Sequence, residues 1–243
     1  MPVPGAVPIA AMLALALASG PAAAIVGGAE GAPGGAVMVL TSTGGVCTGV
    51  LLAPEAVLTA GHCVAGVQAL RIHVRGEDGT PVLIEVAARV VSPGYDAGAV
   101  AGRRRSVDLA LVRAAQPLPG RFAPVALDAA VPQAGDTLAV SGYGAARPGD
   151  PRSTGTFRSV TLPVVEPYGP SQILVWLKGA RGAGPCQGDS GGPVTTPGGG
   201  VLALTAWIDG RCGGLAQAVR LGPQREWIDR TLNQWGLAAR WIP

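Results

Sequence analysis

The hexapeptide Gly188-Asp189-Ser190-Gly191-Gly192-Pro193 is the stretch of this 243-residue sequence on which the prediction of fold and function depends. A serine between glycines, with an acid before it, suits a nucleophile on a tight turn, because glycine adopts conformations closed to other residues. The amides of Gly188 and Ser190 can then point at one developing negative oxygen. Clusters of Gly, Ser and Pro are usually ordinary turns, so the hexapeptide alone is only suggestive.

Two segments upstream strengthen this interpretation. Thr59-Ala60-Gly61-His62-Cys63 places a histidine beside a cysteine, and Asp108-Leu109-Ala110-Leu111 places an acid at the start of an apolar run. Imidazole can take a proton from a nucleophile and return it, and a carboxylate can orient the imidazole. The three segments together supply a nucleophile, a base and an orienting acid.

With Ile25-Val26-Gly27-Gly28 as a fourth segment, the sequence resembles the trypsin-like serine proteases of the chymotrypsin fold. The matching segments, which end with residues 185–193, follow the family's order across nearly the whole chain after residue 24. The resemblance implies an all-β fold of two antiparallel six-stranded barrels with a short C-terminal helix. The barrels are expected over residues 25–128 and 129–243, and the implied function is that of a secreted serine endopeptidase.

The resemblance also implies a role for each matching residue. Ser190 is the nucleophile, His62 the general base and Asp108 its orienting acid, while the amides of Gly188 and Ser190 form the oxyanion hole. A free ammonium on Ile25 is expected to pair with Asp189. No metal or organic cofactor is implied, and the partners are a protein or peptide substrate and a protein protease inhibitor.

The residues implied for the substrate pocket are Gly184, Trp207, Ile208 and Ala216. Gly184 stands where trypsin-type enzymes have an aspartate, so the pocket offers no counter-charge to arginine or lysine. Ile208 replaces a frequent glycine and narrows the pocket. We therefore expect a preference for small or medium apolar side chains. A further departure is Ala206, where the family usually has a serine that helps to hold the aspartate.

Four cysteines, together with an export signal, favour two disulfides in an oxidising compartment. We expect Cys47 to pair with Cys63 and Cys186 with Cys212. Four reduced thiols are the alternative, and the cysteines lack the close paired spacing of a metal site. The first disulfide would close a loop of roughly 15 residues and hold the segment that carries His62.

The first 24 residues have the order of a secretory signal peptide, with an apolar run at 8–19 followed by Ala22-Ala23-Ala24. The run is too short for a comfortable membrane span. One feature does not fit, since residues 1–7 contain no lysine or arginine. Export cleavage after Ala24 would make Ile25 the new N-terminus. After removal of the signal peptide, we expect the mature protein to have no association with a membrane and to be a monomer.

After residue 25, short apolar runs broken by turn residues predict strands, for example at 37–40, 50–52, 69–74, 82–91 and 109–112. The last part of the chain, residues 223–236, is predicted to form a helix instead. Trp227, Ile228, Thr231, Leu232 and Trp235 share one helical face, with Pro223 in the first turn and Gly236 at the end.

A net charge of +3 gives no case for binding nucleic acid. The densest charge run, Arg103-Arg104-Arg105, is either a solvated loop or a rim that draws acidic substrates. Lys178 is the only lysine beside 17 arginines, a bias that suggests a GC-rich bacterial source. Two other functions stay open: a protease-like binding protein without catalysis, and an esterase that uses the same three residues.

Overall fold

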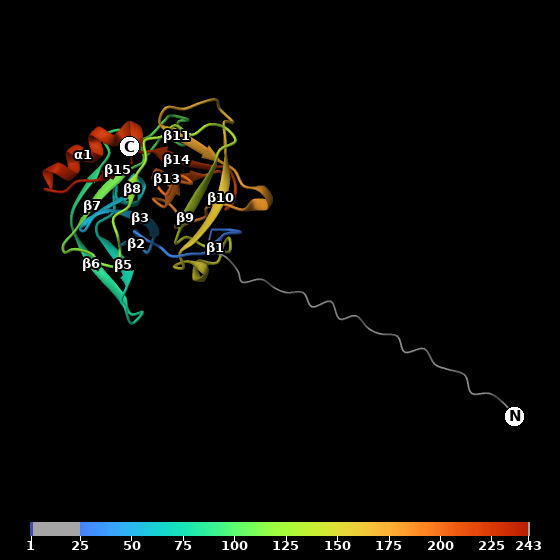
Figure 1. The fold of residues 1–243 in the computed structure, drawn as a ribbon, viewed down its shortest axis with the longest axis horizontal. Helices are drawn as coiled ribbons and strands as arrows, with labels where there is room; N and C mark the ends of the chain where they lie inside the picture. The colour runs from blue at the N-terminus through green and yellow to red at the C-terminus, as the bar shows by residue number, and fades with distance from the viewer. Residues whose placement is uncertain (2–24, 243) are drawn as a thin grey trace.

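The computed structural model describes Met1 and residues 25–242, so the predicted signal peptide, apart from Met1, lies outside the described residues. The described chain forms two β-barrels side by side, with the single α-helix at the end of the chain (Figure 1). Both barrels are antiparallel and six-stranded, which confirms the predicted fold class.

The first barrel is closed in the order β2-β3-β4-β7-β6-β5. Its strands are β2 (Ala36–Thr41), β3 (Val46–Ala53), β4 (Ala56–Thr59), β5 (Leu70–Arg75), β6 (Pro81–Val91) and β7 (Ala110–Ala114). The predicted apolar runs at 37–40, 50–52 and 82–91 lie within strands. The runs at 69–74 and 109–112 each begin one residue before their strand. β-branched and other apolar side chains pack well on a pleated surface whose inner face is buried, which accounts for the match.

The second barrel runs β12-β9-β10-β11-β14-β13, and a β12–β13 pairing closes it. Its strands are β9 (Thr137–Gly142), β10 (Arg158–Val165), β11 (Leu174–Leu177), β12 (Pro193–Thr195), β13 (Val201–Ile208) and β14 (Ala216–Arg220). Two short strands, β8 (Ala126–Leu127) and β15 (Arg240–Trp241), extend this sheet beyond β13. The nucleophile hexapeptide immediately precedes and enters β12.

Three apolar clusters hold the molecule together. One fills each barrel, and the third lies between the barrels, where Leu58 and Leu111 of the first barrel meet Leu204 and Val219 of the second. The predicted helix is confirmed as α1 (Arg225–Gln234), and its buried side chains Trp227, Ile228 and Leu232 join the cluster between the barrels. The helix therefore fastens the two barrels to each other.

The first residues of the described chain pack on the second barrel, although the sequence assigns them to the first. Ile25 is fully buried in the interior of the second barrel, Val26 pairs with Gly184, and β1 (Ala29–Glu30) pairs with β10. We keep residue 128 as the proposed boundary along the chain, because β7 and β9 belong to different barrels. The segments 25–30 and 126–127 lie before that boundary in the chain but pair with strands of the second sheet.

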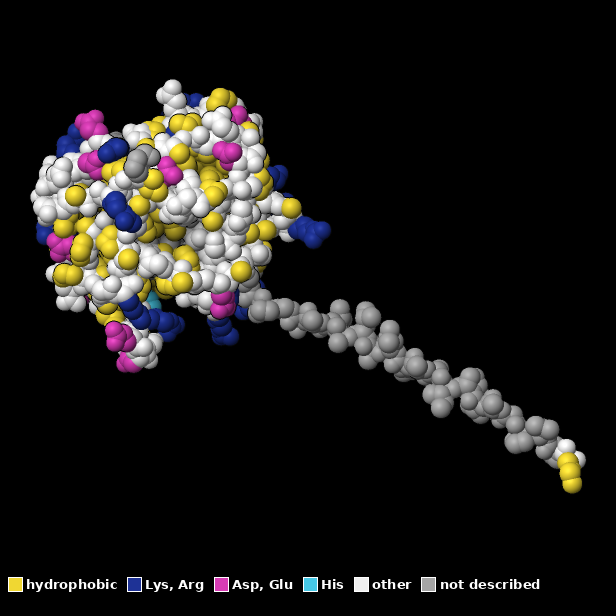
Figure 2. Space-filling model, viewed as in Figure 1, with side chains coloured by type: hydrophobic (Ala, Val, Ile, Leu, Met, Phe, Trp, Pro, Cys, Tyr) yellow, Lys and Arg dark blue, Asp and Glu magenta, His cyan; other side chains and the backbone are white. Residues whose placement is uncertain are grey.

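The face shown in Figure 2 has no single dominant charge. Basic and acidic side chains are dispersed on it among apolar and polar ones (Figure 2). Within residues 25–242, no helix is both long enough and apolar enough to cross a membrane.

Candidate active site

His62 and Asp108 come from neighbouring strand ends of the first barrel. His62 lies in a short 3-10 turn (Gly61–Cys63) after β4, and Asp108 lies just before β7, the strand that pairs with β4. The ring Nδ1 of His62 is 2.7 Å from Asp108 Oδ2, and its backbone N–H donates to Asp108 Oδ1 at 2.8 Å. When Nδ1 carries the proton shared with the carboxylate, Nε2 is left as the acceptor that a general base needs.

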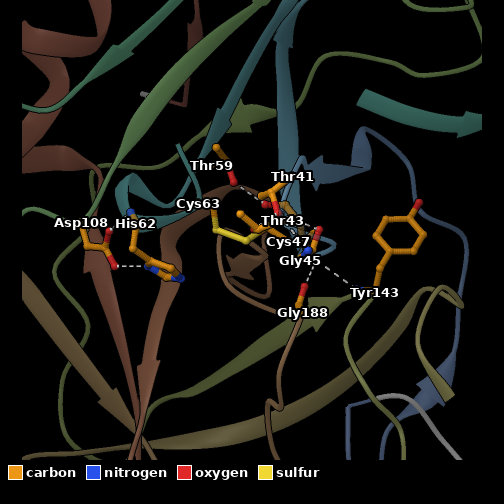
Figure 3. Close-up of a disulfide and its surroundings, with 11 residues drawn as sticks. Thr41, Thr43, Gly45, Cys47, Thr59, His62, Cys63, Asp108, Tyr143 and Gly188 are labelled. Carbon is orange, nitrogen blue, oxygen red and sulfur yellow. Dashed lines mark hydrogen bonds and ion pairs between the residues drawn. A yellow bond between two sulfur atoms is a disulfide. The ribbon is translucent and has the colours of Figure 1, made fainter. Parts of the chain in front are cut away.

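The Cys47–Cys63 disulfide is present and ties β3 to the turn that carries His62. Figure 3 shows the Asp108–His62 pair on one side of this disulfide and Gly188 with Tyr143 on the other. His62 and the two sulfurs are close enough to suggest a metal site, with ligand atoms within 4.8 Å of one another. Both sulfurs are bonded in the disulfide, so neither is a thiolate ligand.

Residues 186–192, which we call the nucleophile loop, hold Ser190 half-buried on a tight turn. The N–H of Asp189 donates to the carbonyl of Cys186 at 3.1 Å, and the N–H of Gly192 donates to the carbonyl of Asp189 at 2.8 Å. Gly191 has a φ of +80°, and a side chain there would collide with the backbone of β3. The glycine after the serine is therefore required by both conformation and space.

Asp189 is fully buried in a cradle formed by Gly142 and Gly144, whose missing side chains leave room for the carboxylate. Its two oxygens accept hydrogen bonds from the N–H groups of Gly144 and Cys186, each at 2.8 Å. Burial raises the pKa of Asp189 to about 7, although the two amide hydrogen bonds act in the opposite direction. Among the described residues, no cation pairs with this carboxylate.

Ile25, the proposed partner of Asp189, is also fully buried, but no ion pair joins the two. The nitrogen of Ile25 is a peptide amide in the full-length chain, because Ala24 precedes it. The neighbouring residue is already fixed, since Val26 exchanges two backbone hydrogen bonds with Gly184 at 3.0 and 2.9 Å. The pairing of an Ile25 ammonium with Asp189 therefore stays a prediction about the processed protein.

The amides of Gly188 and Ser190 donate no hydrogen bond to any other described residue. Such unpaired donors are what an oxyanion hole requires. Ser190 and His62 line the same cavity, but no hydrogen bond between Ser190 Oγ and His62 Nε2 is present in the described structure. This hydrogen bond is often long in unliganded sites and shortens when substrate binds.

The cavity has a volume of about 850 Å³ and runs from the pair His62–Asp108 along the end of β13. Of the four residues expected in the substrate pocket, Trp207 and Ile208 line this cavity, and Gly184 and Ala216 do not. Gly184 is engaged with Val26, and Ala216 is 1% exposed inside the second barrel. The neighbour of Ala216 on β14, Gln217, faces the cavity instead, because adjacent residues of a strand point to opposite faces.

The Cys186–Cys212 disulfide, the second one predicted, is also present and fastens the nucleophile loop to the segment after β13. Ile208 is half-buried and packs against the interior of the second barrel. Ala206, which replaces the expected serine, lines the cavity without a hydroxyl. Both oxygens of Asp108 are engaged by His62 instead.

The far end of the cavity combines an aromatic wall with the arginine run. Trp176 contacts Tyr168 and Trp207 edge-on, with ring centroids 5.1 and 6.4 Å apart. All three arginines of the run 103–105 line the cavity and are exposed. The guanidinium of Arg104 is 2.7 Å from Asp96 and is partly neutralised, whereas Arg103 and Arg105 have no acidic partner among the described residues.

The sequence prediction missed Thr48, which is fully buried and hydrogen-bonded to the nucleophile loop. No pattern in the sequence marks it, because it is one of eight residues in an otherwise ordinary strand next to Cys47. Tyr143 was noticed only as part of a strand end, yet its hydroxyl donates to the carbonyl of Ala36 at 3.1 Å and so bridges the two barrels.

Comparisons with known proteins find a matching family model and related sequences. A family model described as trypsin matches residues 25–228. Kallikrein-15 of Saguinus oedipus is 32% identical over 192 residues, which are 68% of this chain and 72% of that protein. Human kallikrein-15 is 29% identical over 217 residues, or 77% of this chain and 82% of that one. Both relatives are animal proteins and do not support the bacterial source suggested by the arginine bias.

Solved structures share the fold at lower identity. Neuropsin, a serine protease expressed in the limbic system of mouse brain, superposes with a TM-score of 0.72 at 24% identity, covering 85% of this chain and 99% of that one. Human heparin binding protein gives the same TM-score and identity, covering 86% of this chain and 97% of that one. At this identity the likeness concerns the fold alone.

Proposed function

This chain belongs to the trypsin family of serine proteases and is a serine endopeptidase. From this we propose that it is a secreted enzyme, and that it cuts peptide bonds through Ser190, His62 and Asp108. The observation that carries the proposal is the His62–Asp108 pair, which opens into the same cavity as Ser190. The test is intact-mass analysis of the secreted protein before and after a fluorophosphonate probe. One adduct on Ser190 is expected, and an unlabelled, correctly processed protein would contradict the proposal.

In the proposed mechanism, His62 Nε2 takes the proton of Ser190 Oγ while the oxygen attacks the peptide carbonyl. Asp108 keeps the ring oriented and stabilises the imidazolium that forms. The amides of Gly188 and Ser190 receive the negative oxygen of the tetrahedral intermediate. His62 then returns the proton to the leaving amine, and water hydrolyses the acyl-enzyme by the same steps.

The proposed substrates carry a small or medium apolar side chain before the cut bond. This substrate preference is supported by Ile208, whose side chain occupies space at the cavity wall, and by the pairing of the acidic side chains that line the cavity. Two carboxylates, Asp96 and Asp108, line the cavity, and each is already paired, with Arg104 and His62. An arginine or lysine of the substrate would thus lose its hydration without gaining a counter-charge.

A peptide library is expected to show this preference directly. Cleavage should occur mainly after Ala, Val or Leu. Cleavage after arginine and lysine should be disfavoured by roughly 100-fold or more, because their buried charge would have no partner. Replacing Ile208 by glycine should admit larger side chains and leave small ones as substrates. Cleavage mainly after arginine by the parent enzyme would contradict the assignment.

The arginine run is expected to favour an acidic residue near the cut bond. Two matched peptides, one with glutamate and one with glutamine at the same position, report the preference as a ratio of kcat/KM. Replacing Arg103 and Arg105 together by glutamine should lower this ratio by about 2- to 5-fold, which corresponds to the upper part of the range measured for an exposed ion pair. A salt concentration of 1 M should lower it similarly.

The control for this experiment removes two charges elsewhere. Arg152 and Arg240 are exposed and do not line the cavity. Replacing both by glutamine should leave the ratio unchanged. Equal effects of the two double variants would mean that only the overall charge of the protein acts on the peptide.

Two other functions are separated by the same measurements. A binding protein without catalysis would resist the fluorophosphonate, and an esterase would turn over esters while leaving peptides intact. We also propose that the mature enzyme is a monomer and that a protein inhibitor can occupy the cavity. Protein substrates follow from the family itself.

A further inference from the structure

Thr48 makes hydrogen bonds to the nucleophile loop at two residues, Gly188 and Ser190. It lies in β3, a strand of the first barrel, and its side chain is fully buried. Its backbone N–H donates to the carbonyl of Ser190 at 2.8 Å, and its hydroxyl donates to the carbonyl of Gly188 at 2.9 Å. A residue of one barrel therefore holds the catalytic loop of the other.

The direction of the hydroxyl proton follows from its second partner. The N–H of Tyr143 lies 3.0 Å from Thr48 Oγ1, and an amide N–H can only donate. The hydroxyl must therefore accept from Tyr143 and point its own proton at Gly188. The carbonyl of Thr48 is engaged as well, because Thr59 Oγ1 donates to it at 2.6 Å. Figure 3 labels Thr59, Gly188 and Tyr143, the three residues that share these hydrogen bonds with Thr48.

The backbone of Gly188 depends on hydrogen bonds for its orientation more than the other residues of the loop do. It has a φ of +98° and no side chain that could fix its orientation by packing. Rotation of its backbone would turn its N–H away from the position of the oxyanion. The Thr48 hydroxyl holds its carbonyl, and the Thr48 N–H holds the carbonyl of Ser190, so both proposed oxyanion donors have an anchored backbone.

We propose that the Thr48 hydroxyl is a positioning group for the oxyanion hole, which it aligns from the first barrel through the Gly188 carbonyl. The inference rests on the proposed function, since it requires that the Gly188 amide stabilises a tetrahedral intermediate. Oxyanion donors act in the transition state and contribute little to ground-state binding. Loss of the hydroxyl should therefore reduce kcat and leave KM nearly unchanged.

The test compares Thr48→Val with Thr48→Ser in the processed enzyme. Valine keeps the shape but lacks the hydroxyl, and kcat is expected to fall about 10- to 30-fold, less than for loss of a whole oxyanion donor. Serine keeps the hydroxyl and should stay within about 3-fold of the parent. Thr231→Val is the matched control, because it removes a buried hydroxyl that bonds only to the carbonyl of Trp227 within α1.

Two further readouts separate positioning from a general loss of structure. A peptide boronic acid, which forms a tetrahedral adduct on Ser190, should inhibit the valine variant more weakly by the same factor as kcat falls. Peptide binding measured in the Ser190→Ala background should be unchanged by Thr48→Val. If the valine variant does not accumulate, Thr48→Ala removes the same hydroxyl with a smaller side chain. It is judged by the same two readouts, the loss of boronate inhibition relative to the loss of kcat, and peptide binding in the Ser190→Ala background.

The outcomes are distinct from failure of the proposed function. A parent enzyme that neither cleaves peptides nor binds the boronate would refute both ideas. The positioning role alone would be refuted by an active parent whose valine variant keeps its kcat, loses kcat and peptide binding together, or loses no more kcat than Thr231→Val.

Discussion

Replacement of Ser190 by alanine is expected to lower kcat for a cleaved peptide by on the order of 10⁶-fold, while the peptide still binds. The reason is that alanine has no oxygen to attack the carbonyl, so His62 has no nucleophile proton to take and Asp108 no imidazolium to stabilise. The oxyanion amides and the cavity remain, and a small residual rate over the uncatalysed reaction should persist. Steady-state kinetics on one peptide, with single-turnover measurements for the slow variant, give the ratio.

His62→Ala should be about as damaging as Ser190→Ala, and the double variant hardly worse, because the residues act as one unit. Ser106→Ala is the matched control, since Ser106 also lines the cavity but donates to no residue of the site. Activity of the Ser190 variant within 10-fold of the parent would overturn the assignment of the nucleophile.

The second large effect concerns the N-terminus. A protein that begins at Ile25 should be roughly 10²- to 10⁴-fold more active than one that retains Ala24, because only the former carries an ammonium at Ile25. The magnitude follows from the cost of leaving one partner of a buried ion pair alone, about 3–5 kcal/mol. Asp189→Asn should remove the difference by making the processed protein inactive too.

Ile25→Val is the control for this prediction, because valine supplies the same ammonium on a similar side chain. Its activity should stay close to that of the parent. Equal activity of the Ala24-retaining and Ile25-initiated proteins, confirmed by N-terminal sequencing, would show that the nucleophile loop holds its shape without the ion pair.

The same pair of proteins should differ in the pH dependence of stability. Burial raises the pKa of Asp189 to about 7 in the chain without a free Ile25, against an ordinary value of 3.8. The folded state then holds a proton that the unfolded state has lost, so stability falls as pH rises from about 4 to 7, by on the order of 4 kcal/mol. Urea titrations of Ser190→Ala proteins measure this decline.

An ammonium beside Asp189 favours the charged carboxylate, so the processed protein should show a smaller decline over this pH range. Asp189→Asn does not titrate and should abolish the difference between the two forms. A decline of equal size in both forms would mean that the ammonium does not reach the carboxylate.

The sequence predicted local structure well where the residues of one segment are sufficient to determine its conformation. The turn around Ser190 needs glycines for backbone geometry, and the apolar runs become strands because one face of each is buried. For the substrate pocket, the sequence offered only an alignment with the family, which says nothing of the face to which each side chain points. A strand pair sets which residue faces the cavity, and that pairing put Gln217 there rather than Ala216.

By itself, the sequence determined the family, the two-barrel fold, the disulfide partners and the identity of the triad candidates, because these depend on residue types at set spacing. Only the tertiary structure decided which surfaces meet. It placed Ile25 in the second barrel, brought the arginine run to the rim of the cavity and set Thr48 against Gly188, 140 positions away. Contacts across such a separation arise from strand register and barrel docking, which leave no local pattern in the chain.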